Sequence, residues 1–164
     1  MRTMQATRRM RGVWWATAGA CALAASLLGC AGGAPKPTPV AGRVDAAPQV
    51  NPDARNRPSP VLVRVYELKA PTAFNGADFM SLFQGDATAL GAELVSKDEM
   101  TLSPGESRPW SRTLAPETRW IGVFAAYRDL EHARWRAVAA IEPGRKQQVV
   151  VQAGELAVTV SVSR

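Results

Sequence analysis

Short segments of alternating apolar and polar residues, separated by turn residues, constrain the fold of this chain more than any other feature. The last segment is the clearest: it has Leu156, Val158, Val160 and Val162 at every second position. A period of two places such side chains on one face of a strand. Short strands with a turn signal roughly every 8–12 residues are typical of antiparallel β-sandwiches. The sequence therefore predicts a mainly β fold.

The other predicted strands cover residues 41–47, 61–68, 99–102, 107–113, 120–127, 135–141 and 147–152. In the second of them, Val61, Val63 and Val65 share one face, and Arg64 and Tyr66 share the other. Pro109 cannot donate to a neighbouring strand, which predicts an edge strand. Residues 120–127 are apolar on both faces, which predicts a central strand.

The period changes in the segment between the second and third strands, which predicts a helical insertion at about residues 72–92. Asn75 is expected to cap a first helix that carries Phe79, Leu82 and Phe83 on one face and ends at Gly85. Asp86 is expected to cap a second helix that carries Leu90 and ends at Gly91. We interpret the Phe-rich face as a lid on the sheet rather than a ligand site.

The N-terminus has the pattern of a secretory signal. Its basic residues are Arg2, Arg8, Arg9 and Arg11. Residues 13–28 carry no charge, and this run is shorter than the roughly 20 residues that a membrane-spanning helix needs. We interpret residues 1–29 as a signal peptide.

Leu27-Leu28-Gly29-Cys30 resembles the lipobox of bacterial lipoproteins. The resemblance implies cleavage before Cys30 and a covalent lipid on its thiol, with no other cofactor. Ala31 stands where inner-membrane retention signals usually carry Asp, so the resemblance favours the outer membrane. The alternative is a structural Cys buried in a hydrophobic helix.

Removal of the signal changes the charge balance. The chain has 20 Lys and Arg against 14 Asp and Glu, and residues 1–29 hold four of the arginines and no acid. The mature chain is therefore close to neutral, at +2, and no basic cluster in it indicates binding of nucleic acid. Cys21 leaves with the signal, so the mature chain holds no pair of cysteines for an internal disulfide.

The mature chain begins with a proline-rich segment. Pro35, Pro37 and Pro39 favour an extended tether, and ten residues reach roughly 30 Å. We assign residues 30–42 to the lipidated N-terminus and tether, and residues 43–164 to the β-sandwich domain.

A loop rich in turn residues spans residues 49–60. The residues predicted to bind a partner are Asn51, Pro52, Asp53, Ala54, Arg55, Asn56, Arg57 and Pro58. The favoured polar tips are those of Asn51, Asp53, Arg55 and Arg57. Prolines reduce the entropy that a loop loses on binding. The alternative is an ordinary connection between two strands.

The sequence predicts no catalytic site and no metal site. His132 is the only His, in a predicted surface loop, and no Ser lies in a Gly-x-Ser-x-Gly turn. One His and no free Cys disfavour zinc. Asp98 and Glu99 are adjacent in a predicted strand, so their carboxylates would point to opposite faces. A binding or structural protein is favoured over an enzyme.

Several segments resemble the TssJ (SciN) lipoproteins of the type VI secretion system. They are Asn51-Pro52-Asp53, Arg57-Pro58-Ser59-Pro60, residues 63–69, residues 77–83, Ala89-Leu90-Gly91, Pro104-Gly105-Glu106, residues 119–129 and residues 133–136. They lie in the family's order between about residues 42 and 163. Asn56 departs from the pattern, because the family has Gly there. Asn also tolerates a positive φ, so the turn is expected to be kept.

The resemblance implies a transthyretin-like β-sandwich with an added helical piece, anchored in the outer membrane and facing the periplasm. It implies binding of the periplasmic domain of the inner-membrane protein TssM, and indirect contact with other subunits of that membrane complex. The loop at residues 49–60 corresponds to the family's docking loop. Two alternatives remain open: a module that binds a small ligand or glycan between its sheets, and an assembly lipoprotein of another secretion machine.

Overall fold

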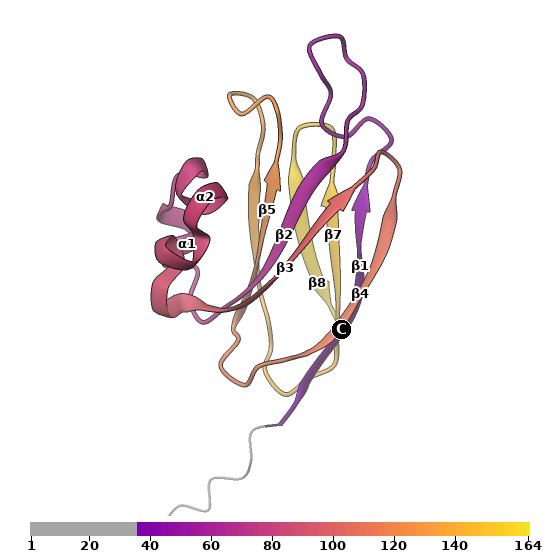
Figure 1. The fold of residues 1–164 in the computed structure, drawn as a ribbon. Coiled ribbons are helices and arrows are strands. Elements are labelled where there is room, and N and C mark those ends of the chain that lie inside the picture. The colour runs from indigo at the N-terminus through magenta and orange to yellow at the C-terminus, as the bar shows by residue number, and fades with distance from the viewer. Residues whose placement is uncertain (1–35) are drawn as a thin grey trace, which may run out of the picture. The chain divides into compact units, whose positions relative to one another are not determined.

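The alternating segments form two facing β-sheets of four strands each in the computed structural model, which describes residues 36–164 (Figure 1). The predicted signal peptide and Cys30 lie outside the described residues. One sheet has the strand order β4-β1-β7-β8 and the other β3-β2-β5-β6. The strands are β1 (Thr38–Ala46), β2 (Val61–Leu68), β3 (Leu94–Leu102), β4 (Ser107–Leu114), β5 (Trp120–Ala126), β6 (Arg136–Ala140), β7 (Gln147–Ala153) and β8 (Val158–Ser163). The predicted mainly β sandwich with a helical insertion is confirmed.

The space between the sheets is filled by apolar side chains. Val61, Val63 and Val65 are buried there, and Tyr66 lies in a separate cluster on the other face of β2, as the alternation predicts. Val160 and Val162 of β8 also pack against the core between the sheets. The predicted positions of β4 at an edge and β5 inside its sheet are confirmed. Within residues 36–164, no helix is both long enough and apolar enough to cross a bilayer.

The first strand begins earlier than predicted. It starts at Thr38 rather than residue 41, so residues 38–42 belong to the sheet and not to the tether. Pairing with β4 on one side and β7 on the other stabilises this segment despite its weak apolar pattern. Gly42 contributes to the pairing, because a Cβ there would overlap the carbonyl of Val149. The third strand likewise begins at Leu94, before the predicted residue 99.

One pairing differs from the antiparallel expectation, since β1 and β7 run parallel. Parallel neighbours need a long crossover connection. Here the chain forms the whole second sheet, the helices and β4 between the two strands, so the requirement is met. Alternation within each strand gives no information about this pairing.

The helical layer consists of α1 (Thr72–Gly76), α2 (Phe79–Leu90) and a short 3₁₀-helix, η1 (Gly91–Glu93). The N-cap of α2 is Asp78, not the predicted Asn75. The Asp78 carboxylate accepts a hydrogen bond from the backbone N–H of Ser81 at 2.8 Å. Gly85 has non-helical φ and ψ of −150° and 48°, yet α2 continues beyond it. It therefore kinks the helix instead of ending it.

Arg64 of β2 compensates for this kink. Its guanidinium donates to the carbonyl oxygens of Leu82 and Phe83 at 2.8 and 3.0 Å. Those carbonyls lie just before the kink, where regular helical hydrogen bonding is interrupted. Asp86, predicted as a cap, is instead buried and lies 3.3 Å from the same guanidinium.

The helices form a lid on the second sheet, as predicted. Phe74, Leu82 and Leu90 are buried in a cluster with Tyr66 and other residues of that sheet. Phe83 lies on the predicted face, with its ring stacked on that of Phe79 and close to Phe124 of β5, but it remains 40% exposed.

A polar cluster surrounds the buried carboxylate of Glu67 where the two sheets meet. The carboxylate accepts hydrogen bonds from the side chains of Ser96 at 2.8 Å, Thr118 at 2.7 Å and Arg112 at 2.9 Å, and from the backbone N–H of Ala115 at 3.1 Å. Burial opposes ionisation of Glu67, but these donors outweigh it and hold its pKa below the ordinary value. The cluster links β2 and β3 of one sheet to β4 of the other.

Candidate partner-binding site

The loop between β1 and β2, residues 47–60, projects from one end of the sandwich (Figure 1). It has no regular secondary structure, and its shape is maintained by backbone hydrogen bonds within its turns together with side chains that bind its backbone. Two residues supply most of these side-chain contacts: Asp53 near the tip and Asn51 at the base.

Asp53 closes the tip of the loop. Its carboxylate accepts hydrogen bonds from the backbone N–H groups of Arg55 and Arg57 at 2.8 and 3.0 Å, and from Nε of Arg57 at 2.8 Å. The hydrogen bond from the Arg57 side chain is the main cause that lowers the pKa of Asp53 to about 2. The carboxylate is therefore ionised throughout the range in which the protein would work.

Asn56 completes the turn at the tip. Its φ of 57° lies in the left-handed region, which confirms that Asn here keeps a conformation otherwise suited to Gly. Its N–H donates to the Asp53 carbonyl at 2.8 Å. The tip is thus held by backbone and side-chain contacts before any partner is present.

Asn51 fixes the base of the loop. It is 3% exposed, its amide donates to the Pro60 carbonyl at 2.7 Å, and its Oδ1 accepts from the backbone N–H of Arg128 at 2.8 Å. These bonds join the two ends of the loop to the β5–β6 connection. Asn51 was predicted to offer a polar tip to a partner, but its amide is buried and already hydrogen-bonded. The exposed loop residues are Pro48, Gln49, Ala54, Arg55, Asn56, Arg57, Pro58 and Pro60.

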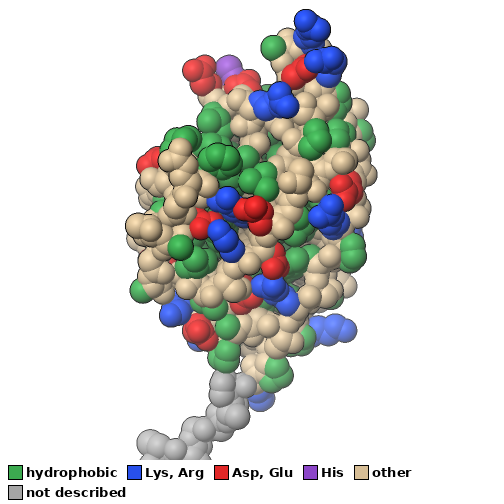
Figure 2. Space-filling view, viewed as in Figure 1, with side chains coloured by type: hydrophobic (Ala, Val, Ile, Leu, Met, Phe, Trp, Pro, Cys, Tyr) green, Lys and Arg blue, Asp and Glu red, His purple; other side chains and the backbone are tan. Residues whose placement is uncertain are grey.

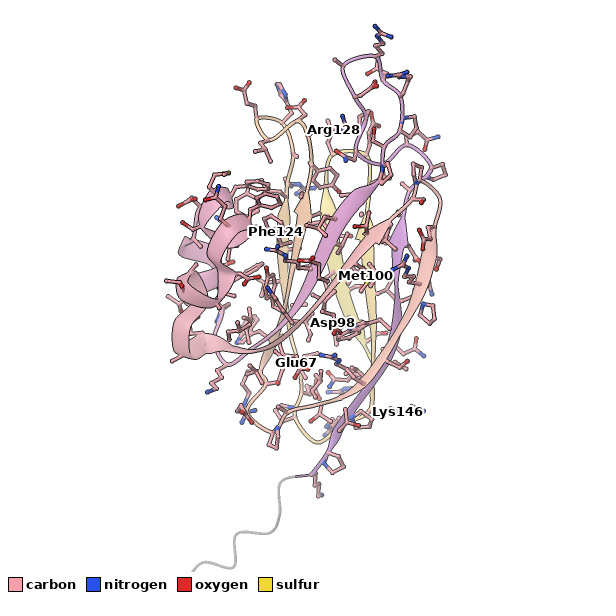
Figure 3. All side chains as sticks on the ribbon, in the orientation of Figure 1. Glu67, Asp98, Met100, Phe124, Arg128 and Lys146 are labelled. Atoms are coloured by element: carbon pink, nitrogen blue, oxygen red, sulfur yellow. The ribbon has the colours of Figure 1, made fainter. Side chains whose placement is uncertain are left out.

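A groove runs beside the loop. It has a volume of about 520 Å³, and its lining is supplied by Pro52, Asp53, Ala54, Asn56, Arg128, Asp129, Glu155 and Leu156. Arg128 lies at the same end of the molecule as the loop (Figure 3). The last four lining residues come from the β5–β6 and β7–β8 connections, which are far from the loop in sequence. No local pattern in the sequence indicates their role, because only the sheet topology brings these three connections together.

The charges at this end are arranged in two groups. Arg55 and Arg57 are exposed at the tip of the loop, where Figure 2 shows basic side chains. Across the groove, Asp129 accepts a hydrogen bond from His132 at 2.9 Å, and this contact lowers the pKa of Asp129. His132 is exposed in its loop, as predicted. The loop side of the groove is therefore basic at its tip, and the opposite side is more acidic.

The described residues offer no evident catalytic or metal chemistry at this site. Within residues 36–164, no three His, Cys, Asp or Glu side chains lie close enough together to hold a metal ion. Asp98 and Glu99 bind different partners on opposite sides of β3: Asp98 accepts from Trp110 at 2.6 Å, and Glu99 accepts from Arg64 at 2.6 Å. The geometry is that of a rigid, charged binding surface.

Comparison with known proteins now identifies the family. A family model described as "Type VI secretion lipoprotein, VasD, EvfM, TssJ, VC_A0113" matches residues 38–156. The chain belongs to this family of type VI secretion lipoproteins. The match includes the loop, the helical lid and seven of the eight strands.

Solved structures agree with the family assignment. The T6SS lipoprotein TssJ1 from Pseudomonas aeruginosa is 40% identical, with a TM-score of 0.75, over 78% of this chain and 98% of that one. Lip of Serratia marcescens, a membrane-bound component of the type VI secretion system, is 27% identical with a TM-score of 0.69, over 76% and 97%. A chain of a structure described as a type VI membrane complex is 26% identical with a TM-score of 0.65, over 76% and 98%. No curated protein in the comparison matches the sequence.

Proposed function

We propose that this type VI secretion lipoprotein is anchored in the outer membrane by a lipid on Cys30, faces the periplasm, and docks the periplasmic domain of TssM. Other subunits of the membrane complex would be reached indirectly, through TssM. The protein needs no catalytic activity and no cofactor for this role beyond the covalent lipid. It holds a partner in place by linking an anchor to a docking surface, which raises the partner's effective concentration near the membrane.

The observation that carries the proposal is the position of the loop. The first described residues and the loop lie at opposite ends of β1, so an N-terminal anchor would leave the loop free to meet a partner (Figure 1). The loop is also preorganised by Asp53 and Asn51, which lowers the entropic cost of binding. A relative of the chain occurs in a structure described as a type VI membrane complex, which supports a role in such an assembly.

The loop's exposed arginines point to an acidic contact on the partner. Arg55 has an exposed side chain and forms no ion pair among the described residues. Arg57 is paired with Asp53 but remains 68% exposed, so its outward N–H groups stay accessible. Arginine can bind a carboxylate through two parallel hydrogen bonds, which favours it at such contacts.

Binding of purified TssM periplasmic domain tests the docking surface. Removal of residues 53–57 should abolish binding while the rest of the domain stays folded. Arg55→Ala should weaken binding by about 10-fold or more, as truncation of a central interface arginine does. Arg43→Ala is the matched control, because Arg43 is also exposed but lies on β1. Full binding by a folded deletion variant would place the docking surface elsewhere.

Fractionation of cells tests the anchor separately. Cys30→Ala removes the thiol that would carry the lipid, so we expect the variant to leave the outer-membrane fraction. Persistence of this variant in that fraction would contradict the anchor assignment and leave the docking test unaffected.

A further inference from the structure

The end of the sandwich opposite the loop is basic. Six basic side chains are exposed there, in the connections and strand ends around the start of β1: Lys36, Lys69, Arg119, Arg145, Lys146 and Arg164. The acidic residues of the same end are Glu93, Glu117 and Glu142. The net charge of this end is therefore +3, which exceeds the net charge of +2 of the whole mature chain. Lys146 marks this end in Figure 3.

The loop end carries no such excess. Its basic residues are Arg55, Arg57, Arg108, Arg128 and Arg134, and its acidic residues are Asp53, Glu106, Asp129, Glu131 and Glu155. The five charges of each sign balance. The positive charge of the molecule is therefore concentrated at the end where β1 begins.

Part of this basic end forms a shallow hollow of about 390 Å³. Its lining includes Lys36, Arg119 and Arg145, together with Pro116, Pro143 and Gly144. Lys36 is held close to the β6–β7 turn, where its Cβ lies 3.2 Å from the position that a Cβ on Gly144 would take. Three cationic side chains thus converge on one concave patch.

Few of these charges are neutralised within the protein. Glu142 lies 2.6 Å from Arg164 and 3.3 Å from Arg145. Lys36, Arg119 and Lys146 form no ion pair among residues 36–164. Their charges remain available to an external anion.

The chain itself limits how far this end can lie from the proposed anchor. Lys36 is the sixth residue after Cys30, and six residues span at most about 22 Å. The segment between Cys30 and the first strand is shorter than the sequence predicted, because β1 begins at Thr38. A lipid on Cys30 would therefore keep the basic end close to the bilayer surface.

We propose that this basic end binds the anionic phospholipid headgroups of the membrane that carries the protein and so orients the loop away from the bilayer. The inference rests on the proposed anchor at Cys30. Each basic residue near an anionic surface strengthens attraction to it by about fivefold. The effect acts within about 10 Å at moderate salt, a range that the tether allows.

A distance measurement on the acylated mature protein in vesicles tests this proposal. With the Cys30 thiol acylated and the signal removed, an introduced cysteine is the one reactive thiol. A fluorophore at Thr113→Cys, on an exposed strand residue near the basic end, reports its distance to a quencher on lipid headgroups. A fluorophore at Ala54→Cys, on the loop, reports the opposite end.

We expect the Thr113 label to be quenched at least twofold more in vesicles containing phosphatidylglycerol than in vesicles of phosphatidylcholine alone. High salt should remove the difference, and the Ala54 label should not be quenched more in the vesicles that contain phosphatidylglycerol. The triple variant Lys36→Gln, Arg119→Gln, Lys146→Gln should lose the difference. The matched double variant Arg55→Gln, Arg57→Gln should keep it. Equal quenching in both vesicles, or a difference that survives the triple substitution, would overturn the proposal.

Failure of the anchor gives a different result. A protein without lipid would not sediment with neutral vesicles at all. Sedimentation with phosphatidylglycerol vesicles then tests the basic end directly: we expect binding that the triple variant weakens by about 100-fold. Absence of binding to both kinds of vesicle would overturn the inference.

Discussion

Replacement of Asn51 by Ala should loosen the base of the β1–β2 loop at a measurable cost in stability. The variant loses two hydrogen bonds, one to the Pro60 carbonyl and one from the Arg128 N–H. Each contributes about 1 kcal/mol to the free energy of unfolding. Asn51 also has a φ of 51°, and Ala in this left-handed region adds about 1 kcal/mol of strain. We therefore expect a loss of about 3 kcal/mol.

Urea unfolding of the Asn51→Ala and unsubstituted proteins measures this loss. The midpoint should fall while the slope with denaturant stays the same, because the surface exposed on unfolding is nearly unchanged. In a thermal scan the same loss lowers the Tm by about 10 °C for a body of this size. Binding to the TssM periplasmic domain should weaken too, since the loop must be ordered again on docking.

Arg55→Ala is the matched control for this experiment. Arg55 is exposed, so its removal should leave the free energy of unfolding within about 0.5 kcal/mol of the original value and lower affinity only. If Asn51→Ala instead behaves like Arg55→Ala, with unchanged stability and weaker binding, our reasoning about the base of the loop is refuted. Asn51 would then act through a direct contact with the partner.

Three further predictions concern the frame and the tip of the loop. Gly42→Ala should destabilise the domain by several kcal/mol, because the new Cβ overlaps the Val149 carbonyl. Gly76→Ala should not, because the space around Gly76 is open, and chemical unfolding of both variants checks this. Glu67 has a lowered pKa in the folded state, so the stability that it contributes is present above about pH 4.5 and is lost as the pH falls through its folded-state pKa. In Glu67→Gln, the free energy of unfolding should therefore depend less steeply on pH in this acidic range. Asn56→Gly should keep the tip conformation and full partner binding, which titration against TssM would show, because Gly adopts a positive φ without strain.

Much of the fold follows from local patterns. The alternation in β2 assigned its valines to the core and Tyr66 to the opposite face, because a strand has only two faces. Pro109 indicated the edge position of β4 through its missing donor. Asn56 was expected to replace Gly at the tip because both residues tolerate a positive φ.

The differences arise where a residue's neighbours come from distant parts of the sequence. The first strand carries few apolar residues and is stabilised by two flanking strands, so its pattern alone did not reveal its start at Thr38. Asp86 resembles a helix cap in sequence, but it accepts hydrogen bonds from Tyr66 and Lys97 at 3.0 and 2.7 Å. Both partners lie on neighbouring strands that only the tertiary structure brings beneath the helix.

The candidate site shows the same limit. The sequence identified the loop through its turn residues, and the exposure of Arg55 and Arg57 agrees with a binding role. It could not separate residues that contact a partner from residues that shape the loop, because Asn and Asp serve both purposes. The groove residues Arg128 and Glu155 come from other connections, and no local pattern links them to residues 49–60.

The two ends of the sandwich suggest how anchoring and docking are combined. A strand of nine residues such as β1 spans about 30 Å, which separates the basic end from the loop end. A basic end resting on the bilayer would hold the loop at roughly that height, whereas a body free on its tether would place the loop at many heights and angles. Restriction of position and angle would raise the effective concentration of the loop for the proposed partner. The charge distribution of the frame would then assist docking without any contact to the partner.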